Sequence, residues 1–176
     1  ERKTVIKPYK GAHLTLSPDG KYVLYHAPGY GKQRDIFVFQ IGSDEPIRIT
    51  SHNGDDWAPC WLAEGKQILF MSNRELGRSD LLSIAFQNGK PMGEPQIIVS
   101  DIGDNVSPYH RSGASSGRLL FSERGNLQGD IFSTNIDPVS GSVLGEPNQL
   151  TSGESQASWP VWSRNGKYLA YYETKE

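Results

Sequence analysis

The sequence is short of cysteine, of long apolar runs and of net charge. Its 176 residues include a single cysteine, Cys60, which excludes an intrachain disulfide and a zinc site built from cysteines. No stretch approaches the roughly 20 apolar residues that a membrane-spanning helix needs, so we expect no membrane insertion. The net charge is −2, so no basic surface is expected to bind nucleic acid.

Helical periodicity is also missing. No window of about 11 residues or more places apolar side chains at the spacing of one helical face, which leaves strands and turns. The chain opens with Glu1-Arg2-Lys3 instead of Met and shows no signal peptide. We therefore expect a mature or excised segment.

The sequence does contain a repeat. Each copy has a turn ending in Gly, a short apolar strand, a polar loop, and an Asp that begins a second apolar strand. Successive turn glycines lie 45, 52 and 49 residues apart. Strand-built repeats of this length are typical of β-propellers. The turn glycines are Gly20, Gly65, Gly117 and Gly166, and the strand-opening aspartates are Asp35, Asp80 and Asp130.

Each unit reads as four strands, which predicts an all-β chain of four-stranded antiparallel propeller blades. The first strand of each unit is short and carries a Pro or an aromatic residue, and Leu16, Trp61 and Trp162 stand in register, with His110 in the third unit. Two similar Gly-rich segments, 89–95 and 141–147, are expected to form turns between the third and fourth strands. We predict one domain, 1–176, with repeats at about 11–50, 55–100, 105–151 and an incomplete 157–176, and with 3–7 as a closing strand.

The run from Ser17 to Tyr25, followed by Asp35-Ile36-Phe37-Val38 and Arg48-Ile49-Thr50, resembles the TolB-type WD-like propeller repeat. The Ser-x-Arg element of that repeat stands at 72–74 and 122–124, and 159–168 matches its opening. The resemblance covers almost the whole chain, although the second and third repeats lack the Pro-Asp of the turn. It implies a bacterial periplasmic or otherwise extracytoplasmic protein.

The number of blades stays open at this stage. Three units are complete and the fourth stops after two strands. Residues 3–7 could close a small ring, because a strand from the other terminus would cover the open edge. The alternatives are a piece cut from a larger ring and two copies that assemble one ring, and the sequence favours an excised or partial ring.

Several candidate chemistries have a plainer interpretation. Gly113-Ala114-Ser115-Ser116-Gly117 fits the pattern of a serine-hydrolase elbow, but no helix follows it, so we expect a flexible loop. The four histidines share no ligand spacing, so we predict no metal and no cofactor. Four arginines recur in the loops before the strand-opening Asp, and we expect them to link blades more often than to hold a ligand. They are Arg34, Arg74, Arg78 and Arg124.

Acidic and aromatic residues gather where first strands begin. Asp55-Asp56 and the 101–105 segment offer oxygen ligands for calcium or a carboxylate pair for glycoside chemistry, but turn-capping carboxylates are the better interpretation. Trp61 and Trp162 are expected to pack between blades, whereas Trp57 and Trp159 could face a ligand.

These observations favour a non-catalytic interaction or ligand-sensing module that uses the loop rim and central depression of a propeller. We expect a protein or peptide partner, with a small sugar as an alternative, and either a homodimer or the remainder of a larger chain. The rival functions are a carbohydrate-active enzyme or lyase with a central site, and the accessory propeller of a larger peptidase. The predicted ligand-binding residues are His13, Asp55, Asp56, Trp57, Asn105 and Trp159.

Overall fold

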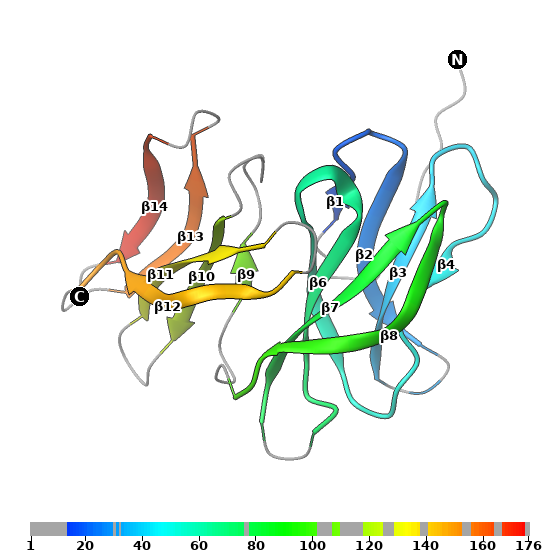
Figure 1. Ribbon diagram of the computed structural model, residues 1–176, viewed down its shortest axis with the longest axis horizontal. Helices are drawn as coiled ribbons and strands as arrows, with labels where there is room; N and C mark the ends of the chain where they lie inside the picture. The colour runs from blue at the N-terminus through cyan, green and yellow to red at the C-terminus, as the bar shows by residue number, and fades with distance from the viewer. Residues whose placement is uncertain are drawn as a thin grey trace.

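The computed structural model describes residues 14–29, 31, 33–75, 78–101, 107–109, 118–124, 129–137, 141–152, 156–163 and 167–174. Within these residues the chain forms strands and one short 3-10 turn (Figure 1). No described helix has the length and apolar character needed to cross a membrane. The predicted all-β class is confirmed.

Among the described residues the strands form three sheets: two antiparallel four-stranded sheets, which are blades 1 and 2, and a six-stranded sheet that contains blade 3 and the hairpin of the fourth repeat. Blade 1 consists of β1 (Thr15–Leu16), β2 (Tyr22–Pro28), β3 (Arg34–Gln40) and β4 (Ile47–Arg48). Blade 2 consists of β5 (Asp56–Trp61), the 3-10 turn η1 (Ala63–Gly65), β6 (Gln67–Ser72), β7 (Asp80–Gln87) and β8 (Lys90–Val99). Blade 3 consists of β9 (Ser107–Tyr109), β10 (Arg118–Arg124), β11 (Gly129–Ile136) and β12 (Val143–Gln149).

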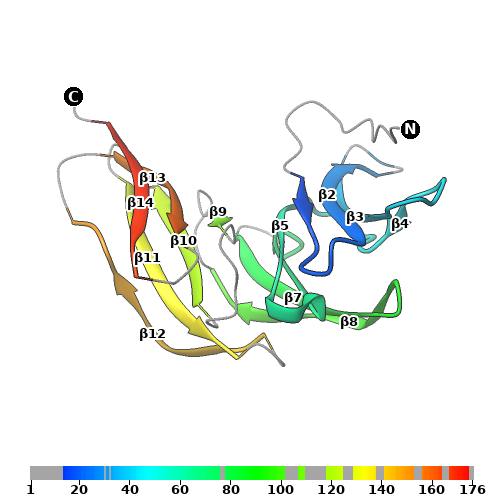
Figure 2. The same cartoon turned by 90° about the horizontal axis from the view of Figure 1, so that it is seen from above.

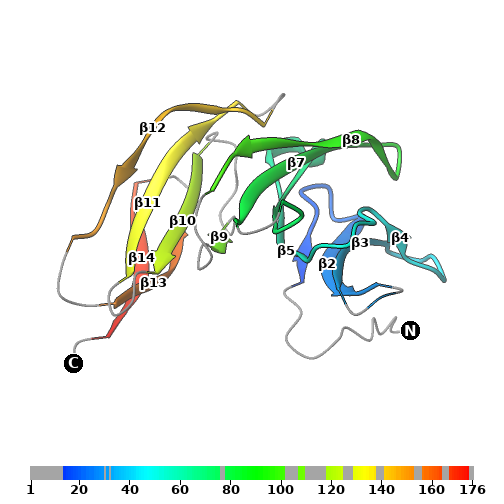
Figure 3. The ribbon, with the colours of Figure 1, turned by 90° about the horizontal axis from the view of Figure 1, so that it is seen from below.

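The described part of the fourth repeat contains β13 (Gln156–Trp162) and β14 (Leu169–Thr174), which pair antiparallel. A single parallel pair, Gly129 with Gln156, connects this hairpin to β11 of blade 3. In Figure 2 the first strands β5, β9 and β13 lie on one side of a curved row, and β8 and β12 lie on the opposite side. Figure 3 shows the same row from below. The predicted propeller architecture is therefore confirmed.

Local turn chemistry explains where the second strands begin. Gly20 (φ 72°) and Gly65 (φ 69°) both adopt the left-handed conformation that favours glycine. In blade 1 the Ser17 hydroxyl donates to Asp19 Oδ1 at 2.6 Å and accepts from the Tyr22 N–H at 2.9 Å. In the fourth repeat the Tyr168 N–H donates to the Ser163 hydroxyl at 2.9 Å. A serine at the equivalent position, Ser17 or Ser163, therefore accepts the same backbone hydrogen bond in two repeats.

The core lies between blades, because β6 packs one apolar face against blade 1 and its other apolar face against blade 3. Ile68 and Phe70 pack in a cluster with residues of blade 1, whereas Leu69 and Met71 pack with Ile136 of blade 3. Alternate side chains of a strand point to opposite faces, so a strand between two blades must be apolar on both. A third cluster, with Ile131 and Ala157, joins blade 3 to the fourth repeat.

Trp61 has the packing role that the sequence predicted. Its side chain is buried and its ring centroid lies 5.2 Å from Phe86 and 6.4 Å from Tyr22 of blade 1. The backbone register is also as predicted, since Leu16, Trp61 and Trp162 pair with Val23, Ile68 and Leu169.

One prediction of strand register and one prediction of a turn were wrong. In blade 3 the partner of Leu120 is Tyr109, so Tyr109 takes the position assigned to His110, which lies outside the described residues. The segment 89–95 is mostly strand: only Asn88 and Gly89 form the turn, and β8 starts at Lys90. Gly93 (φ 73°) and its counterpart Gly145 (φ 83°) accommodate irregularities inside β8 and β12, because glycine tolerates the positive φ of a bulge.

Candidate functional site

The predicted site residues that the structure describes in full lie at the start of β5. Asp55 precedes the strand, Asp56 is its first residue and Trp57 its second. His13 and Asn105 lie outside the described residues. The backbone of Trp159 belongs to β13, but its side chain is not described.

Asp55 connects blade 2 to blade 1. Its Oδ1 accepts hydrogen bonds from the Arg34 N–H at 2.7 Å and from Arg34 Nε at 3.2 Å. Burial alone would raise the pKa of Asp55, but the side-chain and backbone hydrogen bonds from Arg34 and its charge outweigh burial and lower that pKa. Asp55 is therefore held as a carboxylate, and Arg34 links two blades as the sequence predicted.

Trp57 lies under the same arginine. The Arg34 guanidinium carbon is 5.2 Å from the Trp57 ring centroid, within the range of a cation–π contact. The indole is half-buried and packs against the cluster between blades 2 and 3. We call this group, Arg34, Asp55 and Trp57, the Trp57 edge.

A bulge sets the direction of the Trp57 edge. The register between β5 and β6 shifts between Trp57 and Cys60, and Ala58 there has a φ of 48°. A left-handed conformation costs a non-glycine residue roughly 1–2 kcal/mol, and strain of this kind often collects at functional sites. The fourth repeat has a bulge at the equivalent place, between Ser158 and Val161, so the bulge belongs to the repeat.

Asp56 lies on the side of blade 2 that packs against blade 1. It is fully buried, and Arg74 Nη2 lies 3.2 Å from both of its carboxylate oxygens. The same guanidinium donates from Nε to the Ser72 hydroxyl at 2.9 Å and lies 5.7 Å from the Phe70 ring centroid. This arrangement anchors the start of β5 to the end of β6. Asp56 therefore fixes the backbone from which the next residue, Trp57, projects.

The other recurring arginines act within a blade. Arg74 and Asp56 both belong to blade 2, and Arg78 forms an ion pair with Asp80 of the same blade at 3.1 Å. The expectation of links between blades is thus confirmed for Arg34 and wrong for Arg74 and Arg78. The side chain of Arg124 is not described.

The lowered pKa of Asp55 does not suit a general acid. A general acid at neutral pH needs a raised pKa, whereas the pKa of Asp55 is lowered. Burial raises the pKa of the Cys60 thiol to about 12, which keeps it protonated and a poor nucleophile. Among the described residues no three His, Cys, Asp or Glu side chains gather as metal ligands, and the Gly113–Gly117 motif lies outside those residues.

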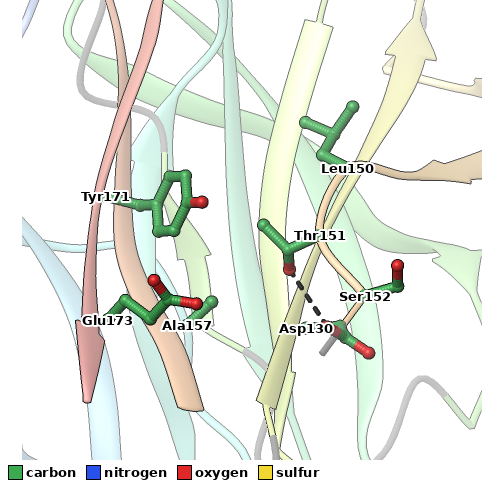
Figure 4. A pocket seen from close by; sticks show the side chains of 7 residues that line it. All are labelled: Asp130, Leu150, Thr151, Ser152, Ala157, Tyr171 and Glu173. Atoms are coloured by element: carbon green, nitrogen blue, oxygen red, sulfur yellow. Dashed lines mark hydrogen bonds between the residues drawn. The ribbon is translucent and has the colours of Figure 1, made fainter. Parts of the chain in front are cut away.

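A second feature, which the sequence reasoning missed, is a pocket of about 300 Å³ between blade 3 and the fourth repeat. In Figure 4, Tyr171 and Glu173 of β14 lie across the pocket from Asp130 and Thr151. The Thr151 hydroxyl donates to Asp130 Oδ1 at 3.1 Å, and Gln149 Nε2 donates to Asp130 Oδ2 at 2.8 Å. The remaining lining residues are Leu150, Ser152 and Ala157.

Comparison with known proteins supports the predicted repeat type. No family model matches the chain. A Tol-Pal system protein TolB from Francisella tularensis is 28% identical over 174 residues, which is 97% of this chain and 38% of that protein. A dipeptidyl-peptidase 5 from Porphyromonas gingivalis is 33% identical over 67 residues, which is 35% of this chain and 10% of that protein.

The fold comparison points the same way. The structure of a putative TolB from Agrobacterium tumefaciens superposes with a TM-score of 0.66 at 19% identity, covering 95% of this chain and 60% of that one. The chain spans well under half the length of the two curated relatives that it matches.

Proposed function

We propose that this chain, which carries TolB-type β-propeller repeats, is part of a non-catalytic extracytoplasmic interaction module that binds a protein or peptide through the Trp57 edge. The observation that carries the proposal is the joint placement of an aromatic ring, a guanidinium and a carboxylate on a rigid junction between two blades. Trp and Arg are the residue types enriched among the few that dominate protein-binding energy. The extracytoplasmic location follows the TolB-type resemblance.

The geometry favours recognition over catalysis. Arg34 is held by Asp55 and Trp57 before any partner arrives, so the Arg34 side chain loses less conformational freedom when a partner binds. The other carboxylate, Asp56, is enclosed by Arg74. A carbohydrate-active enzyme would need two accessible carboxylates, and the alternate faces of β5 separate these two.

A second candidate function is the accessory propeller of a larger peptidase. The match to dipeptidyl-peptidase 5 over 67 residues favours it. In this case the Trp57 edge would contact another domain of the same chain, because the contact chemistry is the same whether the partner is separate or covalently linked.

Site-specific photo-crosslinking in the native cell envelope, with the full-length protein, separates these functions. A photoreactive residue replaces exposed His52, next to the Trp57 edge, or exposed Glu94 on the outer strand β8. We expect a discrete product from position 52, lost on Trp57→Ala, and none from position 94. A product between two proteins supports the interaction module, and one within a single chain supports the peptidase accessory. Equal products from both positions, or products insensitive to Trp57→Ala, would refute the proposal.

A further inference from the structure

The contacts within the Trp57 edge leave part of the Arg34 guanidinium unused. Arg34 Nε donates to Asp55 Oδ1 at 3.2 Å, and the guanidinium carbon lies over the Trp57 ring. The two terminal nitrogens of Arg34, Nη1 and Nη2, bond to none of the residues that the structure describes. The side chain is 42% exposed, and neither nitrogen is among the buried polar atoms of the described residues. Both are therefore accessible to a partner.

The neighbouring arginines use a terminal nitrogen inside the chain. Arg48 Nη2 donates to Asp35 Oδ2 at 2.6 Å, and Arg74 Nη2 lies 3.2 Å from both oxygens of Asp56. These two side chains are also less exposed than that of Arg34. Of the three arginines, Arg34 alone meets its aspartate through Nε, which keeps the end of its guanidinium available.

The available end of Arg34 has the geometry of a fork. Nη1 and Nη2 present two parallel N–H donors in the plane of the guanidinium, and this spacing matches the two oxygens of a carboxylate. A peptide carbonyl has a single oxygen and would satisfy only half of the fork. An ammonium or a second guanidinium has no acceptor to offer. The fork therefore selects a carboxylate over the other groups of a protein surface.

Asp55 limits the negative charge that the site can accept. Burial opposes the shift, but the hydrogen bonds and the charge of Arg34 lower the pKa of Asp55, so Asp55 is ionised at neutral pH. A phosphate carries about two negative charges, and Asp55 would repel it more than a carboxylate with one. A terminal carboxylate is typically captured by backbone N–H groups, whereas the donors here belong to a side chain. The edge therefore fits the side chain of an Asp or a Glu.

We propose that the Trp57 edge recognises an exposed Asp or Glu side chain of its protein partner, whose carboxylate accepts hydrogen bonds from Nη1 and Nη2 of Arg34. Trp57 covers one face of the guanidinium and Asp55 holds its Nε. The fork is therefore oriented before the partner binds, which reduces the entropy that binding costs. This inference rests on the proposed function and adds the chemistry of the partner to it.

The first test measures how variants of the full-length protein bind the partner captured by the photo-crosslink at position 52. Arg34→Gln should raise the dissociation constant roughly tenfold, because a charge-assisted bidentate contact is lost. Arg34→Lys should weaken binding to a similar extent, since an ammonium keeps the charge and can still pair with Asp55 but lacks the fork. Equal affinities of Arg34→Lys and the parent protein would overturn the proposal.

Arg78→Gln is the matched control. Arg78 also pairs with its aspartate, Asp80, through Nε, and its side chain is 39% exposed, but it does not belong to the Trp57 edge. We expect Arg78→Gln to leave the dissociation constant unaltered. A loss as large as that of Arg34→Gln would show a general effect of surface charge and would contradict the proposal.

A double-mutant cycle then identifies the carboxylate. Mass spectrometry locates the partner peptide that is joined to position 52, and each Asp or Glu in that peptide is replaced by its amide. We expect one replacement to weaken binding to the parent protein roughly tenfold and to have little further effect on Arg34→Gln, because both changes remove the same contact. Independent effects at every acidic position, or a peptide without an acidic residue, would refute the proposal.

The inference and the proposed function fail in different ways. If Trp57→Ala leaves the photo-crosslinked product unchanged, the proposed function is wrong and this inference is wrong with it. If Trp57→Ala removes the product whereas Arg34→Lys and the amide replacements leave the affinity unchanged, the edge binds a protein without using a carboxylate. Only the inference is then wrong.

Discussion

Replacing Arg74 by Ala tests whether the buried ion pair between Arg74 and Asp56 holds the start of β5 in place. Asp56 is fully buried, and the Arg74 side chain is only 16% exposed. Removing one partner of a buried ion pair leaves the other charge without compensation, which typically costs about 3–5 kcal/mol. The substitution also removes the hydrogen bond to Ser72 and the contact with Phe70. We therefore expect the free energy of unfolding to fall by about 3 kcal/mol or more.

Arg34→Ala is the matched control, because it also removes an arginine from an aspartate. This pair is more exposed, with side-chain exposures of 42% and 32%, and exposed pairs contribute about 1 kcal/mol or less. Urea unfolding followed by tryptophan fluorescence measures both variants, and Arg74→Ala with Asp56→Asn should recover part of the loss. If Arg74→Ala cost no more than Arg34→Ala, the argument from burial would be wrong.

Three further predictions concern pH, the thiol and the core. Because the folded-state pKa of Asp55 is lowered, its stabilisation is present above the ordinary carboxyl pKa of about 3.9 and lost as pH falls through the folded value. When urea unfolding is measured at decreasing pH, the difference in free energy of unfolding between the parent protein and Asp55→Asn should disappear as the pH falls through the folded-state pKa of Asp55. Cys60 should resist a thiol reagent at pH 8 until urea unfolds the protein, since its pKa is about 12; rapid native labelling would contradict this. Phe70→Ala should lower the free energy of unfolding by about 3–5 kcal/mol in the same urea assay, and a loss below about 1 kcal/mol would contradict its packing between blades.

The blades were predictable because their signals are local. A glycine with positive φ shapes the first turn of blades 1 and 2, and a serine that accepts from the backbone shapes the equivalent turn of blade 1 and of the fourth repeat, all within a few residues. The packing role of Trp61 was predictable too, because its place before the turn is common to several repeats. The error in segment 89–95 has a physical cause: Gly-Glu-Pro has turn composition, but Gly93 sits in a bulge inside a strand.

The choice of partner for each arginine was not predictable from the sequence. Asp55 and Asp56 are adjacent, yet the alternation of a strand sends them to opposite sides, so Arg34 pairs with the first and Arg74 with the second. The pocket was missed because its walls come from β11 and β14, which no local pattern connects. The signal that could have found it is the correspondence between the second and fourth repeats, in which equivalent residues of the first two strands lie 101 positions apart. This correspondence places Glu173 where Ser72 stands.

The affinity of the Trp57 edge for the crosslinked partner tests the central claim most directly. The dissociation constant of the purified partner is measured for the parent protein, for Trp57→Ala and for Tyr168→Ala, whose tyrosine is 71% exposed in another repeat. We predict that Trp57→Ala raises the dissociation constant at least tenfold, or about 1.4 kcal/mol, and that Tyr168→Ala leaves it unchanged. Equal affinities of Trp57→Ala and the parent protein would contradict the account.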